Sequence, residues 1–188
     1  MANPPDDVPA WRMHGERTLY DNRWVKLTQV DVEPPDGSRF WHHVVYLDHV
    51  SIAVVLDDTQ RVLMLWRHRF VPNQFGWELP GGICEAGESP AVTAARETEE
   101  ETGFRPGEPK HLITFEPQPG MVASPHHLYL FQGATEVGGP TDEEEASHIE
   151  WIPLDEVMGL IAQGKVAGCG SLVGLLWVLA NHKVLSCP

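Results

Sequence analysis

The chain has 188 residues, a length that suits one domain with a small appended element and is ample for a packed core. Its 13 lysines and arginines face 27 aspartates and glutamates, which gives a formal net charge of −14. This balance argues against a nucleic acid as the main partner, because binding a phosphate backbone needs basic patches. A membrane span is not expected either, since the longest apolar run, residues 172–180, is far too short to cross a bilayer.

The amino terminus and the cysteines indicate a cytoplasmic protein. Residues 1–14 are polar and rich in proline, and they lack the apolar core of a signal peptide, so we expect them to be disordered. Cys84, Cys169 and Cys187 are an odd, scattered set without metal-binding spacing. Such a set is typical of reduced thiols in the cytosol.

The sequence predicts strands and helices that interleave along the chain. Residues 24–32 and 39–47 are expected to form a hairpin around the turn Pro34-Pro35-Asp36-Gly37, within an N-terminal β-hairpin element of residues 15–48. Further strands are expected at residues 50–56, 61–66, 111–115, 127–131 and 148–152, and helices at residues 90–102, 154–163 and 171–182. This order favours an α/β class with a mixed sheet between helices, in a domain of residues 49–184.

The helix expected at residues 90–102 has clear signals at both ends. Ser89 suits the N-cap and Pro90 suits the first helical position. Gly103 suits the residue that ends a helix in a left-handed turn. The sequence therefore defines where this helix begins and stops.

Three glutamates share one face of this helix. Glu97, Glu100 and Glu101 stand at i, i+3 and i+4, a spacing that brings like charges together at a cost of a few tenths of a kcal/mol, roughly, per pair. A bound cation would offset that repulsion, and carboxylate oxygens suit Mg²⁺ first, with Mn²⁺ as the alternative. Taken alone, the three glutamates would favour a solvated acidic face over a metal site.

The surrounding spacing decides between these two interpretations. From residue 82 the chain has a glycine, five residues, a glutamate, seven residues, Arg-Glu, two residues, Glu-Glu, one residue, and a glycine followed by an apolar residue; these are Gly82, Glu88, Arg96-Glu97, Glu100-Glu101 and Gly103-Phe104. This pattern resembles the box of the Nudix hydrolases, which cleave nucleoside diphosphates linked to another moiety. Thr98 departs from the Leu, Ile or Val usual in the family, at a position that packs the helix. The resemblance implies an α/β/α sandwich with a mixed sheet and Mg²⁺ among the carboxylates.

Segments on both sides of the box resemble the ADP-ribose pyrophosphatase group of that family. They are Arg67-His68-Arg69-Phe70, Trp77-Glu78-Leu79-Pro80-Gly81-Gly82 and Gln118-Pro119-Gly120-Met121. The resemblance implies substrate-binding roles for Arg67, Arg69, Glu78, Gly120 and Met121, and it places Gly81 with Glu97, Glu100 and Glu101 as metal ligands. Two simpler interpretations stay open, namely that Arg67 and Arg69 are surface charges and that Glu78 is an ion-pair partner.

The catalytic base is expected in an acidic run after the box. Hydrolysis needs a carboxylate that takes a proton from the attacking water. Related pyrophosphatases supply it from a loop before a late strand, and the equivalent run here, residues 142–145, points to Glu145 with Glu144 next. A solvated charged loop is the alternative, in which case Glu97 or Glu100 is the base. The resemblance also implies that Glu88 pairs with Arg96, so that Arg96 orients the metal-binding carboxylates.

The resemblance implies a Mg²⁺-dependent hydrolase that cleaves ADP-ribose to AMP and ribose 5-phosphate. The alternatives are another nucleotide sugar or a dinucleotide polyphosphate as substrate, or a non-catalytic Nudix module that senses a nucleotide. The group also implies a homodimer in which the N-terminal hairpin packs on the partner subunit. Trp24 and Phe40, in this hairpin, are expected either in a core or stacked on the adenine.

Overall fold

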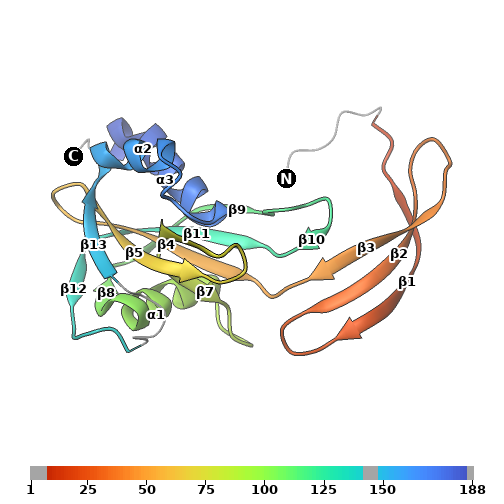
Figure 1. Cartoon of the computed structure of the whole chain (residues 1–188), viewed down its shortest axis with the longest axis horizontal. Helices are drawn as coiled ribbons and strands as arrows, with labels where there is room; N and C mark the ends of the chain where they lie inside the picture. The colour runs from red at the N-terminus through yellow and green to blue at the C-terminus, as the bar shows by residue number, and fades with distance from the viewer. Residues whose placement is uncertain (1–7, 142–147, 186–188) are drawn as a thin grey trace. The chain divides into compact units, whose positions relative to one another are not determined.

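The computed structural model describes residues 8–141 and 148–185. The chain divides into two compact units. The first holds the chain up to Asp48 together with residues 118–124, and the second holds residues 49–117 and everything from Pro125 onward. Each unit has its own sheet (Figure 1).

The first unit is a four-stranded sheet in the order β1-β2-β3-β10. Its strands are β1 (Arg12–Asp21), β2 (Lys26–Glu33), β3 (Phe40–Tyr46) and β10 (Val122–Ala123). The predicted hairpin corresponds to β2 and β3, which pair antiparallel, and Gly37 turns between them at φ 78° while its N–H bonds to the carbonyl of Pro34. The hairpin is not a lone pair of strands, because β1 adds antiparallel to β2 and β10 adds parallel to β3.

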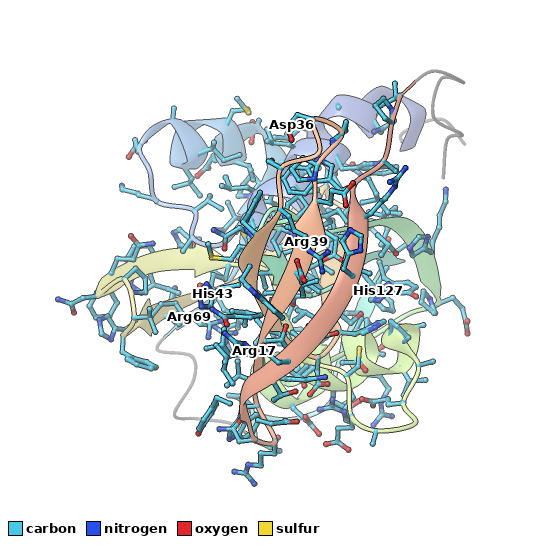
Figure 2. The ribbon with its side chains drawn as sticks, turned by 90° about the vertical axis from the view of Figure 1, so that its right-hand side faces the viewer. Arg17, Asp36, Arg39, His43, Arg69 and His127 are labelled. Atoms are coloured by element: carbon cyan, nitrogen blue, oxygen red, sulfur yellow. The ribbon has the colours of Figure 1, made fainter. Side chains whose placement is uncertain are left out.

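Strand β1 has no counterpart among the predicted strands, and it begins at Arg12, inside the segment 1–14 for which disorder is expected. All of its residues are exposed, so it carries no hydrophobic alternation that would reveal a strand. Polar pairs across the sheet hold it instead. Arg17 donates two hydrogen bonds to Gln29 on β2 (Figure 2), and Arg12 forms an ion pair with Glu33 at the end of β2.

The second unit is built on a seven-stranded mixed sheet. Its main order is β13-β5-β4-β11-β9, with β6 paired to β5 and β7 paired to β4. The strands are β4 (Val50–Leu56), β5 (Arg61–Arg69), β6 (Gln74–Glu78), β7 (Gly81–Ile83), β9 (Pro109–Phe115), β11 (His126–Gln132) and β13 (His148–Pro153). β11 runs parallel to β4, whereas the other pairs are antiparallel. The short strands β8 (Phe104–Pro106) and β12 (Ala134–Glu136) pair with each other.

Helices cover both faces of this sheet, which confirms the predicted α/β/α arrangement. Helix α1 (Pro90–Thr102) lies on one face, and α2 (Leu154–Ala162) and α3 (Cys169–Leu185) lie on the other (Figure 1). The buried residues form two clusters accordingly, one on each side of the sheet. None of the described helices is long and apolar enough to cross a membrane.

Strand β4 shows why its residues form a central strand. It is buried on both faces: Val54 packs in the cluster that includes α2 and α3, and the next residue, Val55, packs in the cluster that includes α1. A continuous run of β-branched and apolar residues is the pattern expected for such a strand. Its bounds, Val50–Leu56, are those predicted from the sequence.

The sheet opens between its two central strands. β4 and β5 pair at Leu56 with Val62, where the turn joins them. Beyond this point β5 takes β6 as its antiparallel partner and β4 takes β7. The chain therefore crosses from one strand to the other between Glu78 and Gly81, and the box loop enters the sheet at this opening.

Candidate active site

The box helix begins and ends where the sequence predicts. Ser89 is the N-cap residue and Pro90 occupies the first turn, although the Ser89 side chain makes no capping hydrogen bond. Gly103 closes the helix at φ 73°, and its N–H bonds to the carbonyl of Glu99. Thr98, the departure from the family pattern, is fully buried, and its hydroxyl donates to the carbonyl of Ala94 at 2.7 Å. The helix thus accommodates a polar residue at a packing position without an unsatisfied group.

Two glycines let the loop before α1 lie directly on its neighbours. A Cβ at Gly81 would collide with the backbone of Ser51 and come within 2.9 Å of the Cα of Ile52. A Cβ at Gly82 would meet the carboxylate of Glu97. The glycine that opens the box is therefore needed for close approach to a glutamate of α1.

Arg96 forms ion pairs with three of the box glutamates. Its guanidinium bonds both oxygens of Glu88, at 2.9 Å through Nε and 3.0 Å through Nη2. Its Nη1 lies 2.9 Å from Glu97 Oε1 and 2.8 Å from Glu100 Oε2. The Arg96 guanidinium, with a smaller contribution from Thr93, holds the pKa of Glu88 at about 2. The expected Glu88–Arg96 pair is present, and Arg96 contacts two of the carboxylates predicted to bind metal.

Glu101 is held by a different arginine. Its Oε1 accepts a 2.6 Å hydrogen bond from Arg67 Nη2, and its Oε2 accepts the backbone N–H of Gly81 at 2.9 Å. The side chains of Arg67 and Glu101 are 2% and 3% exposed, so this is a buried ion pair. Burial raises the pKa of Glu101 to about 7 even though Arg67 and the Gly81 N–H favour its ionised form. The interpretation of Arg67 as a surface charge is therefore wrong.

Arg69 and Glu78 form a second pair beside the first. Arg69 donates to both oxygens of Glu78 through Nε at 2.9 and 3.1 Å, and its Nη2 donates to Oε2 at 2.6 Å. Glu78 also lies 3.9 Å from Arg67 Nε. The four side chains thus form one ion-pair network in the order Arg69–Glu78–Arg67–Glu101. The network extends from the half-exposed Arg69 to helix α1.

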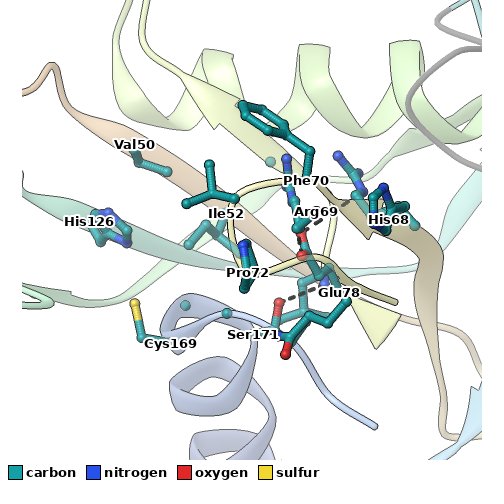
Figure 3. Close-up of a pocket in the computed structure, with 18 residues that line it drawn as sticks. Val50, Ile52, His68, Arg69, Phe70, Pro72, Glu78, His126, Cys169 and Ser171 are labelled. Atoms are coloured by element: carbon teal, nitrogen blue, oxygen red, sulfur yellow. Dashed lines mark hydrogen bonds and ion pairs between the residues drawn. The ribbon is translucent and has the colours of Figure 1, made fainter. Parts of the chain in front are cut away.

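A cavity of about 610 Å³ opens beside these charges, in the gap between β4 and β5 (Figure 3). Arg67, Arg69, Glu78 and Gly81, four residues predicted for substrate or metal, line it together. Its size lies in the range of small-molecule sites. The remaining wall comes from the ends of β4 and β11, the segment after β5 and the start of α3.

The three predicted metal-binding carboxylates do not converge in this structure. Glu97 and Glu100 form ion pairs with Arg96, and Glu101 forms one with Arg67. Within residues 8–141 and 148–185 no three His, Cys, Asp or Glu side chains are grouped closely enough to hold a metal. The chemistry of the donors nevertheless fits a hard divalent cation, since all three are carboxylates. A nearby cation would also favour the ionised form of Glu101, which burial opposes.

Other predicted residues lie elsewhere. Gly120 and Met121 belong to the first unit, where the Gly120 carbonyl lies 2.8 Å from Nε2 of His42 and the Met121 carbonyl accepts the N–H of Val45. Trp24 and Phe40 are exposed in that unit, so neither is a core residue there. Glu144 and Glu145 lie outside the described residues.

The cavity also contains residues that sequence reasoning missed. His126 and Cys169 line the part of it away from Arg69, and Ser171 lines it beside Glu78 (Figure 3). Ser171 is the N-cap predicted from the sequence, but α3 begins earlier, at Cys169, and the Ser171 hydroxyl accepts the N–H of Leu79 at 2.9 Å. The glycines at 168 and 170 were the available signal of close packing, and in the structure a Cβ at Gly170 would meet the side chain of Ile52.

Comparison with known proteins identifies the family. The model of the NUDIX domain matches residues 45–167, which include the opening of the sheet, the box and its helix. The chain belongs to the Nudix hydrolase family. It is therefore a pyrophosphohydrolase of a family that uses divalent metal ions.

Relatives of this Nudix hydrolase include enzymes with different substrates in their names. It is 50% identical over 169 residues to the CMP-5'-(N-acetyl-N-hydroxy-3-aminopropyl)phosphonate hydrolase of Streptomyces rubellomurinus, an alignment that covers 90% of this chain and 82% of the relative. It is 30% identical to the ADP-ribose pyrophosphatase of Mycobacterium tuberculosis over 89% of this chain and 81% of the relative. A crystal structure of an ADP compounds hydrolase shares the fold, with a TM-score of 0.83 at 18% identity over 97% of this chain and 99% of the other.

Proposed function

We propose that this Nudix hydrolase cleaves the anhydride between a nucleoside 5′-phosphate and a second phosphorus-containing group. Water adds to one phosphorus, the bridging P–O bond breaks, and each product leaves with its own terminal phosphorus acid. The observation that carries the proposal is the cavity in which Arg67, Arg69, Glu78 and Gly81 meet beside the carboxylates of α1. Arginine side chains bind phosphate oxygens through paired hydrogen bonds, so this end of the cavity suits the anhydride.

Two substrates are proposed. ADP-ribose, which would yield AMP and ribose 5-phosphate, is the substrate expected from the flanking segments, and it is supported by the 30% identical ADP-ribose pyrophosphatase. A cytidine nucleotide linked to a phosphonate is the second, and the 50% identical phosphonate hydrolase favours it. Both substrates carry the same phosphorus anhydride, so the proposed chemistry is shared.

The cofactor proposed is Mg²⁺, with Mn²⁺ as an alternative. Glu97, Glu100, Glu101 and Gly81 would hold it, and it would supply charge neutralisation at the bridging phosphoryl oxygens. Arg96 contributes by fixing Glu97 and Glu100 on one side of α1. Arg67 positions Glu101, whose carboxylate also receives the Gly81 N–H.

Glu145 is proposed as the base that takes the proton of the attacking water, with Glu144 as the alternative. The support is the attachment of the chain just before the acidic run. Thr141, the last described residue before that run, donates its N–H to the carbonyl of Glu100 at 2.9 Å, on the helix that carries the proposed metal-binding carboxylates.

A homodimer is also proposed, formed through the sheet of the first unit. This sheet exposes large apolar side chains on several strands, among them Met13, Tyr20, Phe40 and Trp41. Met13 and Phe40 both pair with Val32 and so share one face, whereas Trp41 follows Phe40 on β3 and lies on the other face. A second copy of the chain would cover the face with Met13 and Phe40 symmetrically. The free thiols of Cys84 and Cys169 support the proposed cytoplasmic location.

A substrate panel tests the proposed function. Purified protein would be incubated with ADP-ribose, CDP-linked compounds, a CMP-linked phosphonate and diadenosine polyphosphates, each with Mg²⁺, with Mn²⁺ and with EDTA. We expect metal-dependent release of AMP or CMP, identified by chromatography. Absence of turnover on the whole panel, with binding of a nucleotide retained, would favour the non-catalytic sensing module instead.

A further inference from the structure

The cavity has two chemically different ends. Arg67, Arg69 and Glu78 make one end highly charged. At the other end His126 and Cys169 face the space across from Ile52 and Pro72 (Figure 3). Between them the wall is largely apolar, with Ile52 and Leu79 buried in the core behind it. A ligand that fills the cavity must therefore carry a charged part and an uncharged part.

His126 is the polar side chain that distinguishes the far end. It is the first residue of β11, and its ring packs edge-on against Phe115 with centroids 5.5 Å apart. Its Nδ1 is buried, 3.8 Å from the point where a Cβ on Gly170 would lie. Within the described part of the chain, neither ring nitrogen has a hydrogen-bond partner. The side chain lines the cavity, so a ligand that reaches this end meets an imidazole with no protein partner among the described residues.

The surroundings of this imidazole favour its neutral form. Burial lowers the pKa of His126 below its ordinary value, and the opposing effect of Glu116 is smaller. A neutral ring offers one donor or one acceptor according to its tautomer and attracts no phosphate charge. It therefore suits an uncharged group that presents an N–H or a C=O.

We propose that His126 is a specificity-determining residue that hydrogen-bonds the uncharged organic group of the substrate while Arg67 and Arg69 hold its phosphorus groups. The inference rests on the proposed cleavage of a nucleotide anhydride. The group bound is either the nucleobase or the organic moiety carried on the second phosphorus. Both carry uncharged hydrogen-bonding groups, and the experiment distinguishes them.

Three variants test the assignment. His126→Phe keeps a flat ring but removes the hydrogen bond, and His126→Gln restores a polar atom near the place of Nε2. His127→Phe is the matched control, because His127 is the next residue on β11 but bonds His49 and Thr114 and does not line the cavity. Thermal unfolding would first verify that all three variants fold.

The expected kinetic result is a rise in KM of about tenfold for His126→Phe, with kcat within about twofold of wild type. His126→Gln is expected to recover most of the loss, and His127→Phe is expected to retain the wild-type KM. An unchanged KM in His126→Phe on every hydrolysed substrate would overturn the proposal. An equal rise in His127→Phe would overturn it too, because the effect would then come from general disturbance of β11.

Calorimetry with AMP, CMP and ribose 5-phosphate identifies the group and does not depend on turnover. His126→Phe should weaken either the nucleoside monophosphates or ribose 5-phosphate by about tenfold, and not both. Loss of the former assigns the nucleobase to His126, and loss of the latter assigns the second moiety. Equal losses for both halves, or none, contradict the proposal even if the wild-type enzyme is active. The wild type could also hydrolyse none of the substrates while this binding pattern holds. In that case the proposed reaction is wrong, but the contact between His126 and the ligand is supported.

Discussion

Arg67 on strand β5 and Glu101 on helix α1 share a 2.6 Å hydrogen bond while both are almost fully removed from solvent. The same carboxylate receives the N–H of Gly81, so one side chain joins the strand, the helix and the box loop. The pair therefore has a structural role besides the proposed role of Glu101 in metal binding.

Loss of Arg67 should destabilise the fold. Arg67→Met would leave Glu101 buried without its cation, and the expected loss is about 3–5 kcal/mol in the free energy of unfolding, measured with urea. Arg69→Met is the control, because the Arg69 side chain is 47% exposed and its pair with Glu78 should contribute at most about 1 kcal/mol. Equal losses in the two variants would show that the buried pair is no more important than the partly exposed one.

Glu100→Gln should remove activity but preserve the fold. It deletes one charge at nearly constant shape, and kcat is expected to fall by about two orders of magnitude or more. The Glu100 side chain is 45% exposed, so unfolding in EDTA should change little. Glu99→Gln is the matched control, since Glu99 pairs with Arg105 outside the box network. Near-normal turnover of Glu100→Gln would remove the proposed metal site.

Glu145→Gln tests the proposed base. The expected result is a large fall in kcat with nearly unchanged affinity for Mg²⁺, because this carboxylate is proposed to act on water and not on the metal. Metal titration followed by turnover measurements would separate the two effects. Full activity in Glu145→Gln but not in Glu144→Gln would move the base by one residue, and full activity in both would return it to Glu97 or Glu100.

The Glu88–Arg96 pair predicts an acid sensitivity. The pKa of Glu88 is lowered from 4.5 to about 2 in the folded state. The ionised Glu88 therefore contributes its full share of the folding stability above pH 4.5, and that share is lost as pH falls toward 2. Urea unfolding without metal should show wild type losing up to about 3 kcal/mol more than Glu88→Gln over that interval. Parallel pH profiles for the two proteins would contradict the assignment of a depressed pKa to this pair.

The proposed dimer predicts the effect of charge on one face of the first sheet. Met13 and Phe40 both pair with Val32, from opposite sides, and all three belong to one row of the sheet. Aspartate at both exposed positions should weaken dimerisation by about a hundredfold or more, measured by light scattering across micromolar concentrations. Arg17→Gln, on the row that pairs with Gln29, should leave the dimer intact. A wild-type monomer at these concentrations would exclude the dimer.

Removal of the N-terminal element gives an independent check of the dimer. Deletion of residues 1–47 leaves the box untouched, but it takes away the strands that would meet the partner subunit. We expect the truncated protein to be monomeric and inactive on substrates that the full chain hydrolyses. An active monomer would mean that the substrate site is complete within the second unit.

The helix and central strands could be predicted because their signals are local. Pro90 and Gly103 mark the ends of α1, and the continuous apolar run marks β4. The charged box residues follow from spacing, and the Glu88–Arg96 pair is found in the structure as expected. These features depend on a few neighbouring residues, which a sequence displays directly.

Other features depend on tertiary contacts that no local pattern reveals. Strand β1 has no buried face, so nothing in its hydrophobicity indicates a strand. His126 becomes part of the cavity only because β11 runs parallel to β4 and α3 begins beside it. No local pattern indicates that Glu100 pairs with Arg96 whereas Glu101 pairs with Arg67.

The opening between β4 and β5 has a consequence for how substrate range can change in evolution. One wall of the cavity belongs to the β5–β6 pair of strands and the other wall to the β4–β7 pair. The two pairs are joined by the pairing of Leu56 with Val62 and by the backbone at Leu79 and Pro80. A substitution that widens or reshapes one wall therefore leaves the hydrogen-bond register of the other wall undisturbed. The cavity can therefore change its shape on one side while helix α1 keeps its place on the sheet.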